Sequence, residues 1–171
     1  MTRSTRLLGA LLVALCSSIM ALWHSAQAAE FACAAGDVAC LIAAINAANA
    51  NGEANTITLA AGTYTLTAVK NSTDQPNGLP VISSTLTIMG VGADTTIIER
   101  AADAPAFRLV AVVLRGTLTL KGLTLRGGLV PSSLTGSQGG GLHNAGTLMI
   151  TDSTLADNAA SFGGGIQILA S

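Results

Sequence analysis

The residues from Gly139 to Ile166 read GGGLHNAGTLMITDSTLADNAASFGGGI, so a block of three glycines followed by a branched aliphatic residue returns after 24 residues. A second motif, Thr-Leu-x-Ile or Thr-Leu-x-Leu, begins at Thr85, Thr117 and Thr147, with spacings of 32 and 30 residues. Repeats with periods of about 20 to 50 residues are typical of solenoids, in which each unit stacks on the one before it. The sequence therefore predicts an array of stacked units.

Within each unit, apolar residues alternate with threonine or another polar residue, which is the pattern of a strand with one buried face. Gly, Asn or Asp separates these runs, as expected of tight turns. The runs predicted to be strands are 56–59, 63–67, 85–88, 95–98, 117–120, 123–125 and 147–150. We expect an all-β fold, a parallel β-helix in which Leu and Ile stack inward. An antiparallel sandwich is the competing fold, but regular hairpins do not explain a repeated glycine block.

A helix is predicted over residues 38–50. Asp37 precedes it and can accept hydrogen bonds from its first free amides, and Gly52 follows it, where a left-handed residue can end the helix. An apolar stripe at helical spacing consists of Leu41, Ile45 and Ala48. The first rung of a solenoid exposes strand edges and the end of its apolar core. We therefore expect residues 29–54 to form an N-terminal cap whose amphipathic helix covers that end.

Residues 1–28 have the pattern of a secretory signal peptide. Basic residues near the start are followed by an apolar run from Leu7 to Trp23 and by the small-residue ending Ala26-Gln27-Ala28, so cleavage is predicted after Ala28. A retained membrane anchor is the alternative, but the run is shorter than the ~20 residues that span a bilayer. No later run reaches that length, since the apolar run at 109–114 has the length of a buried strand.

Cys33 and Cys40 remain after this cleavage, and disulfides persist in exported proteins. We predict a disulfide that ties the segment before the helix to its first turn. Two unpaired buried thiols are the alternative, and a metal site is disfavoured because no third or fourth ligand stands nearby. Residues 55–171 are assigned to the rungs of the solenoid, which we expect to continue beyond Ser171.

The composition excludes several classes of function. The formal net charge is −1 and only 10% of residues are charged, so the chain lacks the basic excess that nucleic-acid binding requires. The hydrophobic content of 50% excludes a disordered chain. Aromatic residues make up 3% of the chain and there are two histidines, which leaves few groups for catalysis or for stacking on sugars.

Two parts of the chain resemble known families. Residues 41–49, LIAAINAAN, and 55–64, NTITLAAGTY, resemble the CSLREA-type N-terminal cap of bacterial surface proteins, whose motif reads C-S-L-R-E-A-I-x-x-A-N…D-T-I-x-L-x-x-G-x-Y. Ile and Ala stand here in place of its Arg and Glu. Residues 139–148 and 158–166 resemble repeats of right-handed parallel β-helix, pectin-lyase-like proteins and are similar to those of chlamydial-type polymorphic outer-membrane proteins. The resemblance implies an exported protein of the bacterial surface.

Three residues of the clearest repeat are candidate catalytic groups. Asp152 and Asp157 form a carboxylate pair, and a glycoside hydrolase needs two facing carboxylates. Both stand at predicted turns, where Asp bonds its own backbone, so a structural role is predicted. His143 is suited to proton transfer near neutral pH, but no partner stands at a defined spacing, so we expect an exposed or hydrogen-bonded turn histidine. Asn144 and Asn158 are expected to form inward-facing turn ladders.

Several basic residues stand near predicted strand ends. They are Arg100, Arg108, Arg115, Lys121 and Arg126. They could line a face for an anionic glycan, but solvated flanks that discourage edge aggregation explain them equally well. We predict no catalytic residue, no cofactor and no metal ligand.

The sequence favours a secreted or surface-displayed, non-enzymatic adhesin or binding scaffold, located outside the cell or at the bacterial outer membrane. A rigid rod would display loops such as 70–80 and 128–138 to a glycan or to the surface of a host or neighbouring cell. The alternative is a polysaccharide lyase or glycoside hydrolase whose site is incomplete in these residues, because this fold class also includes enzymes. A non-functional remnant is the third possibility.

Overall fold

The computed structural model describes residues 28–134 and 137–169. The predicted signal peptide, residues 1–28, lies almost entirely outside this part of the chain and stays a prediction. The described chain forms one helix, α2 (Val38–Asn51), and twelve strands. The strands are β1 (Glu30–Cys33), β2 (Ala54–Leu59), β3 (Gly62–Leu66), β4 (Thr85–Met89), β5 (Thr96–Arg100), β6 (Val110–Val112), β7 (Thr117–Lys121), β8 (Thr124–Arg126), β9 (Leu142–Asn144), β10 (Thr147–Thr151), β11 (Thr154–Ala156) and β12 (Ile166–Ile168).

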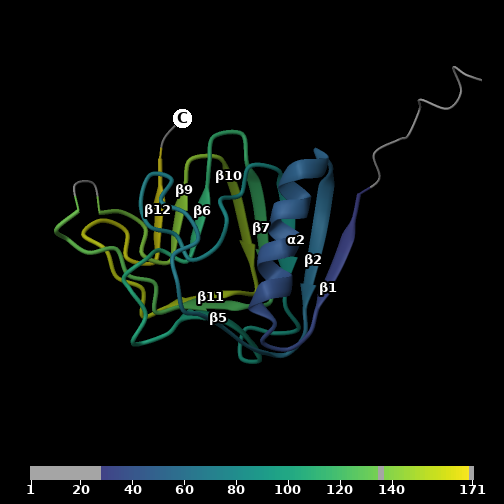
Figure 1. Cartoon of the computed structure of the whole chain (residues 1–171), viewed down its shortest axis with the longest axis horizontal. Coiled ribbons are helices and arrows are strands. Elements are labelled where there is room, and N and C mark those ends of the chain that lie inside the picture. The colour runs from purple at the N-terminus through teal and green to yellow at the C-terminus, as the bar shows by residue number, and fades with distance from the viewer. Residues whose placement is uncertain (1–27, 135–136, 170–171) are drawn as a thin grey trace, which may run out of the picture.

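The strands form three sheets, and every pairing between them is parallel (Figure 1). The first sheet has the order β1-β2-β4-β7-β10, the second β3-β5-β8-β11 and the third β6-β9-β12. Consecutive strands of the chain mostly lie in different sheets, whereas neighbours within a sheet belong to successive turns of the solenoid. This arrangement confirms the predicted parallel β-helix, and the antiparallel sandwich is wrong.

Each turn of the solenoid is one rung. The first rung consists of β2, β3 and the segment 67–84, the second of β4 to β6, the third of β7 to β9, and the last described rung of β10 to β12. Thr85 pairs with Thr117, and Thr117 pairs with Thr147. The repeated Thr-Leu motif therefore forms one column of the first sheet, which explains its period.

The seven predicted strands are all present, with ends that differ by one or two residues. The helix is also confirmed and ends one residue later than predicted. The sequence analysis misses β1, β9, β11 and β12, and it marks only an apolar run where β6 lies. Apart from β1, these strands have three residues each, which is too short to show a period-two pattern.

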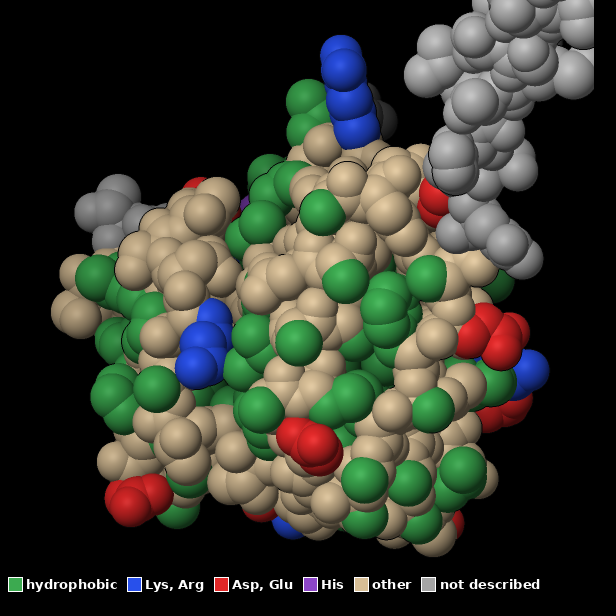
Figure 2. Space-filling view, turned by 45° about the vertical axis from the view of Figure 1, so that its right-hand side comes forward, with side chains coloured by type: hydrophobic (Ala, Val, Ile, Leu, Met, Phe, Trp, Pro, Cys, Tyr) green, Lys and Arg blue, Asp and Glu red, His purple; other side chains and the backbone are tan. Residues whose placement is uncertain are grey.

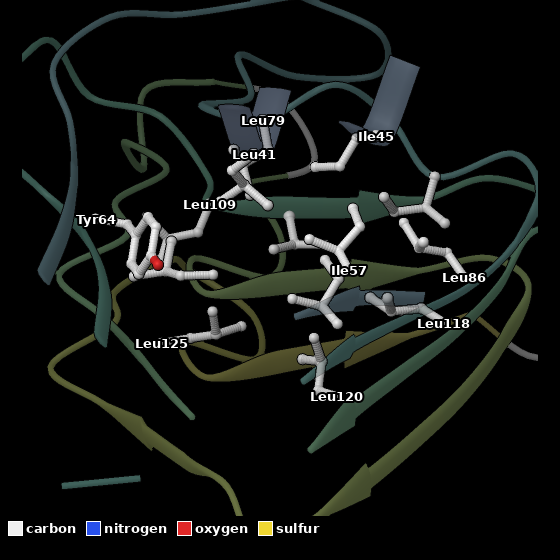
Figure 3. Close-up of a cluster of buried hydrophobic side chains, with 14 of the residues drawn as sticks. Leu41, Ile45, Ile57, Tyr64, Leu79, Leu86, Leu109, Leu118, Leu120 and Leu125 are labelled. Atoms are coloured by element: carbon white, nitrogen blue, oxygen red, sulfur yellow. The ribbon is translucent and has the colours of Figure 1, made fainter. Parts of the chain in front are cut away.

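The core consists of aliphatic columns enclosed by the three sheets (Figure 3). Ile57, Ile88 and Leu120 form one column, since the strand register pairs them from rung to rung. All three are fully buried. Burial of such a side chain contributes about 1.5–3 kcal/mol, so the columns are the main source of stability.

Helix α2 lies across the first rung and covers the end of the core (Figure 1). Its buried face consists of Leu41, Ala44, Ile45 and Ala48. The side chain of Asp37 accepts a hydrogen bond from the backbone N of Cys40 at 2.9 Å. Gly52 ends the helix in the left-handed conformation, with φ of 74°. The structure confirms the predicted lid together with both of its end signals.

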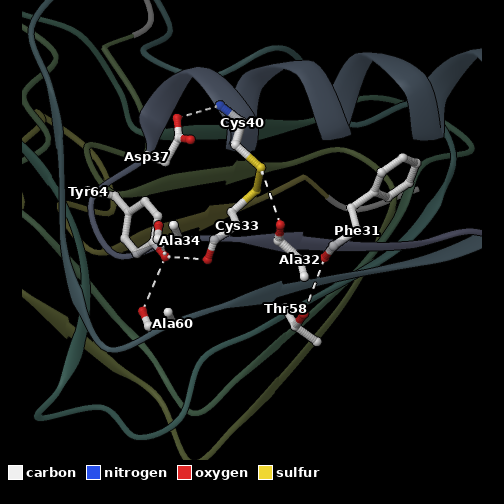
Figure 4. The surroundings of a disulfide bond; sticks show 9 residues. All are labelled: Phe31, Ala32, Cys33, Ala34, Asp37, Cys40, Thr58, Ala60 and Tyr64. Atoms are coloured by element: carbon white, nitrogen blue, oxygen red, sulfur yellow. Dashed lines mark hydrogen bonds between the residues drawn. A yellow bond between two sulfur atoms is a disulfide. The ribbon is translucent and has the colours of Figure 1, made fainter.

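Cys33 and Cys40 form a disulfide, as predicted, with their Cα atoms 5.6 Å apart (Figure 4). The bond joins β1 to the first turn of α2. Beside it, the buried Tyr64 hydroxyl lies 2.9 Å from the carbonyl of Ala34 and 3.2 Å from those of Cys33 and Ala60. Burial raises the pKa of the Tyr64 phenol, so the hydroxyl stays a hydrogen-bond donor to these carbonyls.

Within residues 28–134 and 137–169, no helix has the length and apolar character needed to cross a membrane. The surface in Figure 2 shows no broad patch of one charge, and its acidic and basic side chains are few. This agrees with a chain in which only 10% of residues are charged.

Candidate functional site

A densely hydrogen-bonded loop of residues 71–77 lies in the first rung, and is named here the 71–77 loop. An antiparallel bridge between Asn71 and Asn77 closes it. The fully buried Asn77 amide donates hydrogen bonds to Oδ1 of Asn71 at 2.8 Å, to the carbonyl of Thr73 at 3.0 Å and to that of Gln75 at 2.7 Å. One side chain therefore holds the backbone of the whole loop.

The 71–77 loop joins the third side of the solenoid through backbone hydrogen bonds. Arg108 N donates to the carbonyl of Pro76 at 2.9 Å, and Gly78 N donates to the carbonyl of Arg108 at 2.8 Å. The prediction that residues 70–80 form a displayed loop is correct only for its tip. Residues 72–74 are exposed, whereas residues 77–79 are buried in the solenoid.

A groove of about 320 Å³ lies between α2 and this loop, and is named here the α2 groove. Its lining residues are Ile42, Asn46, Asn49, Lys70, Asn71, Thr73, Pro80 and Val81. Asn49 fastens the helix to the wall of the groove, since its amide donates to the carbonyl of Val81 at 2.7 Å and its Oδ1 accepts from the backbone N of Ser83 at 3.0 Å. The groove is thus built on a fixed frame.

Three polar side chains in the α2 groove are free of other described residues. Asn46, Lys70 and Thr73 are exposed, and their side chains make no hydrogen bond or ion pair within the part of the chain that the structure describes. Together they offer an amide, an ammonium and a hydroxyl group. These groups can bind the hydroxyls and carboxylates of a sugar without losing an existing interaction.

On the other side of the loop lies a cluster of Asp74, Arg108 and His143. Arg108 is fully buried, and its guanidinium donates from Nε to the carbonyl of Gly139 at 3.1 Å and from Nη2 to that of Gln138 at 2.7 Å. Its Nη1 lies 3.6 Å from Oδ2 of Asp74. Burial lowers the pKa of Arg108, and the nearby Asp74 carboxylate opposes that effect.

His143 lies in β9, where it pairs with Ala111 on one side and Gln167 on the other. Its Nδ1 is 3.5 Å from Oδ2 of Asp74, while its buried Nε2 has no hydrogen-bond partner in the described chain. Burial lowers the pKa of His143, the charge of Arg108 lowers it further, and Asp74 raises it. The imidazole is therefore held neutral at neutral pH.

A cavity of about 180 Å³ borders this cluster. Asp74 and His143 contribute to its wall, and aliphatic residues such as Val113, Leu114 and Leu169 form much of the rest. A carboxylate and a neutral imidazole thus line one small cavity, and the buried guanidinium of Arg108 contacts the carboxylate from behind. Such a set can transfer a proton in principle, but the imidazole nitrogen that would do so is buried.

The structure overturns part of the interpretation of the basic residues. Arg108 is not a solvated strand flank but is fully buried. The guanidinium of Arg100 is also hydrogen-bonded within the fold, since it donates to the carbonyls of Gly127, Ala101 and Ala104. A row of free cations for an anionic glycan therefore does not form along these strand ends.

Arg126 is likewise paired, in an ion pair across the second sheet. Its Nη2 lies 2.6 Å from Oε2 of Glu99, and Oε1 of the same carboxylate accepts from the hydroxyl of Thr65 at 3.1 Å. Of the five basic residues, the two that remain are Arg115 and Lys121. Both are exposed, and their side chains make no hydrogen bond or ion pair in the described chain.

The two aspartates lie at bends as predicted, but neither side chain hydrogen-bonds the backbone in the described chain. Asp152 and Asp157 are exposed and occupy left-handed backbone, with φ of 50° and 52°, on either side of β11. Asn144 is the last residue of β9, and its Oδ1 accepts from Gly146 N at 3.2 Å, while Asn158 follows β11 and its Oδ1 accepts from Gly128 N at 2.9 Å. These residues form the corners of the rungs. Asn144 pairs with Val112 and Ile168 in the neighbouring strands, so the predicted asparagine ladder does not form there.

His143 is a buried strand residue and not an exposed turn residue; its Nδ1 contacts Asp74, while its Nε2 has no partner in the described chain. The sequence analysis also misses Asp74 and Lys70 as site residues. The signal that could have found Asp74 is weak, since it consists only of one Asp and two asparagines within one loop. In the described ranges, no group of three or more His, Cys, Asp or Glu side chains is placed to hold a metal ion.

Comparison with models of known protein families, with curated proteins and with solved structures found no match for this chain. The parallel solenoid with its helical lid is therefore established by the arrangement of the strands themselves.

Proposed function

We propose that the protein is an exported binding scaffold, secreted or displayed at the bacterial surface, that binds a glycan without transforming it. The leader-like residues 1–28 and the resemblance to CSLREA-capped, pectin-lyase-like surface proteins support export. The disulfide between Cys33 and Cys40 is consistent with an oxidising compartment. Detection outside the cell of a product that begins at Ala29 would test this part, and retention of the full leader would contradict it.

The α2 groove is the observation that carries the binding proposal. It is concave, its frame is held by Asn49, and it presents the free side chains of Asn46, Lys70 and Thr73. Sugars are bound by such directional hydrogen bonds, and a single ammonium favours a glycan that carries carboxylates. The exposed loop tips at 72–74 and 132–134 could enlarge the contact with a cell surface.

Isothermal titration of the full chain with an oligogalacturonate, and with a neutral gluco-oligosaccharide of the same length, tests this proposal. We expect the acidic glycan to bind and Lys70→Ala to weaken binding about tenfold or more, since a hydrogen bond to a charged group contributes about 1.5–3 kcal/mol. Lys121→Ala is the matched control, because Lys121 is an equally free lysine that lies in β7. Equal losses in both variants, or no binding, would contradict the α2 groove as the site.

A polysaccharide lyase or hydrolase is the second candidate function. The observation in its favour is a cavity lined by Asp74 and His143, whose carboxylate and imidazole lie 3.5 Å apart, with Arg108 against Asp74. Incubation of the full chain with polygalacturonate and alginate should then release unsaturated or reducing ends. Turnover that Asp74→Asn abolishes would favour the enzyme over the scaffold, whereas binding without turnover would favour the scaffold.

A further inference from the structure

The nitrogen of Ala29, the first residue after the predicted cleavage, is held by a buried side chain. The backbone N of Ala29 donates to Oδ1 of Asn55 at 2.9 Å, and the carbonyl of Ala29 accepts from the backbone N of Thr56 at 3.1 Å. Ala28 is exposed, whereas Ala29 is half-buried. The peptide bond predicted to be cleaved therefore lies at the surface, while the nitrogen that cleavage would release is already fixed by the fold.

Asn55 is a rigid acceptor for that nitrogen, since the residue is only 2% exposed. Its amide donates to the carbonyl of Glu53 at 2.8 Å and to Oδ1 of Asn51 at 2.9 Å, while its Oδ1 also accepts from the amide of Asn51 at 2.8 Å. Because oxygen acceptors occupy the amide protons of Asn55, its Oδ1 is the atom that faces Ala29. The direction of the acceptor is thus set before any cleavage.

The surroundings of this nitrogen favour a positive charge. The amide nitrogen of Asn55 lies 3.4 Å from the carbonyl of Ala48, in the last turn of α2, where the helix carbonyls carry partial negative charge. The last turn of α2 contains no basic residue. Residues 28–54 contain three carboxylates and no Lys or Arg. The cap therefore has a negative end that no basic side chain of its own compensates.

We propose that Asn55 is the binding site for the α-ammonium group of the mature chain, so that removal of the leader completes the N-terminal cap. This inference rests on the proposed export and on cleavage after Ala28. Hydrolysis of that peptide bond takes up one water, leaves a carboxylate on Ala28 and places an ammonium at the nitrogen of Ala29. A neutral donor thus becomes a charged one at the same atom, and a charge-assisted hydrogen bond is about twice as strong.

The exported product of the full chain tests the proposal when it is compared with a variant that has one alanine inserted between Ala28 and Ala29. Mass spectrometry shows where each product begins. Cleaved after Ala28, the variant keeps an α-ammonium but displaces it by about 3.3–3.6 Å, and the nitrogen of Ala29 stays a neutral amide. We expect chemical denaturation to give the variant a folding equilibrium constant about tenfold smaller, because hydrogen bonds to charged groups contribute more than neutral ones.

Nuclear magnetic resonance of the product that begins at Ala29 shows whether the ammonium is at Asn55. The side-chain amide signal of Asn55 should move as rising pH removes the charge of the α-ammonium, and the insertion should abolish that movement. Asn158 is the control, because its amide also donates inside the fold, to the carbonyl of Leu125, but lies in the last described rung.

Two kinds of failure are distinguishable in these experiments. A product that begins at Ala29 but whose Asn55 signal does not move, or whose stability equals that of the variant, would overturn the proposal and leave export intact. A product that begins at another residue would contradict the proposed processing itself, and this inference with it.

Discussion

Asp74 and Arg108 are held together across two rungs, with Oδ2 of Asp74 3.6 Å from Nη1 of Arg108. The guanidinium is fully buried while 62% of the Asp74 side chain is exposed. An exposed ion pair contributes little, so the carboxylate is not what compensates the burial of Arg108. The carbonyls of Gln138 and Gly139 do so, which makes Arg108 a structural link between the 71–77 loop and the third rung.

Replacement of Arg108 by Met should destabilise the protein by about 3 kcal/mol, because the carbonyls of Gly139 and Gln138 lose their donors inside the fold. Asp74→Asn should cost less than about 1 kcal/mol. Chemical denaturation measures both. Lys121→Met, which changes an exposed side chain, is the control. A larger loss for Asp74→Asn than for Arg108→Met would show that the ion pair dominates.

The stability of the protein should decrease on acidification because of His143. Its pKa is lowered in the folded chain, whereas a histidine in the unfolded chain has a pKa near 6.5. Below about pH 6.5 the unfolded chain therefore binds a proton that the folded chain does not. Above that pH, His143 should not change the free energy of unfolding. Below it, the free energy of unfolding should decrease by at most about 1.4 kcal/mol per pH unit, until the pH reaches the pKa of His143 in the folded chain.

Denaturation curves at several pH values test this dependence. His143→Gln removes the titrating group, so its unfolding free energy should vary less between neutral pH and the onset of carboxylate titration. If the unfolding free energy changes equally with pH in both proteins, groups other than His143 cause the dependence.

Removal of the disulfide should lower stability by about 2–3 kcal/mol, the value expected for a short closed loop. The double change Cys33→Ala and Cys40→Ala, or a reductant, should lower the melting temperature to a similar extent. The double variant itself should not respond to reductant. If reductant also leaves the melting temperature of the unaltered protein unchanged, the disulfide does not contribute to its stability.

Two glycines of the repeated blocks, Gly140 and Gly165, should differ in their tolerance of alanine. A Cβ on Gly140 would meet the backbone oxygen of Ala159, while the nearest atom to a Cβ on Gly165 is 3.9 Å away. Gly140→Ala should therefore destabilise by about 1–3 kcal/mol or more. Gly165→Ala should stay within about 0.5 kcal/mol of the unaltered protein. Thermal melts of the two variants provide a matched comparison, and equal effects would contradict the close packing of rungs at Gly140.

Part of this structure follows from signals close together in the sequence. The Thr-Leu repeats predict the first sheet, Asp37 and Gly52 predict the ends of α2, and the short spacing of Cys33 and Cys40 predicts their bond. Each of these depends on local geometry or on a regular period, and a single chain displays both directly.

The burial of Arg108, the contact of Asp74 with His143 and the α2 groove are decided by the tertiary structure. Their residues come from different rungs or from α2 and the first rung, and the loop lengths between these elements determine which of them meet. The sequence alone does not show whether a basic residue near a strand end faces water or the carbonyls of the next turn. What the sequence determined by itself was the stacking of the rungs, because that follows from the period, while the site depends on how irregular loops fold over them.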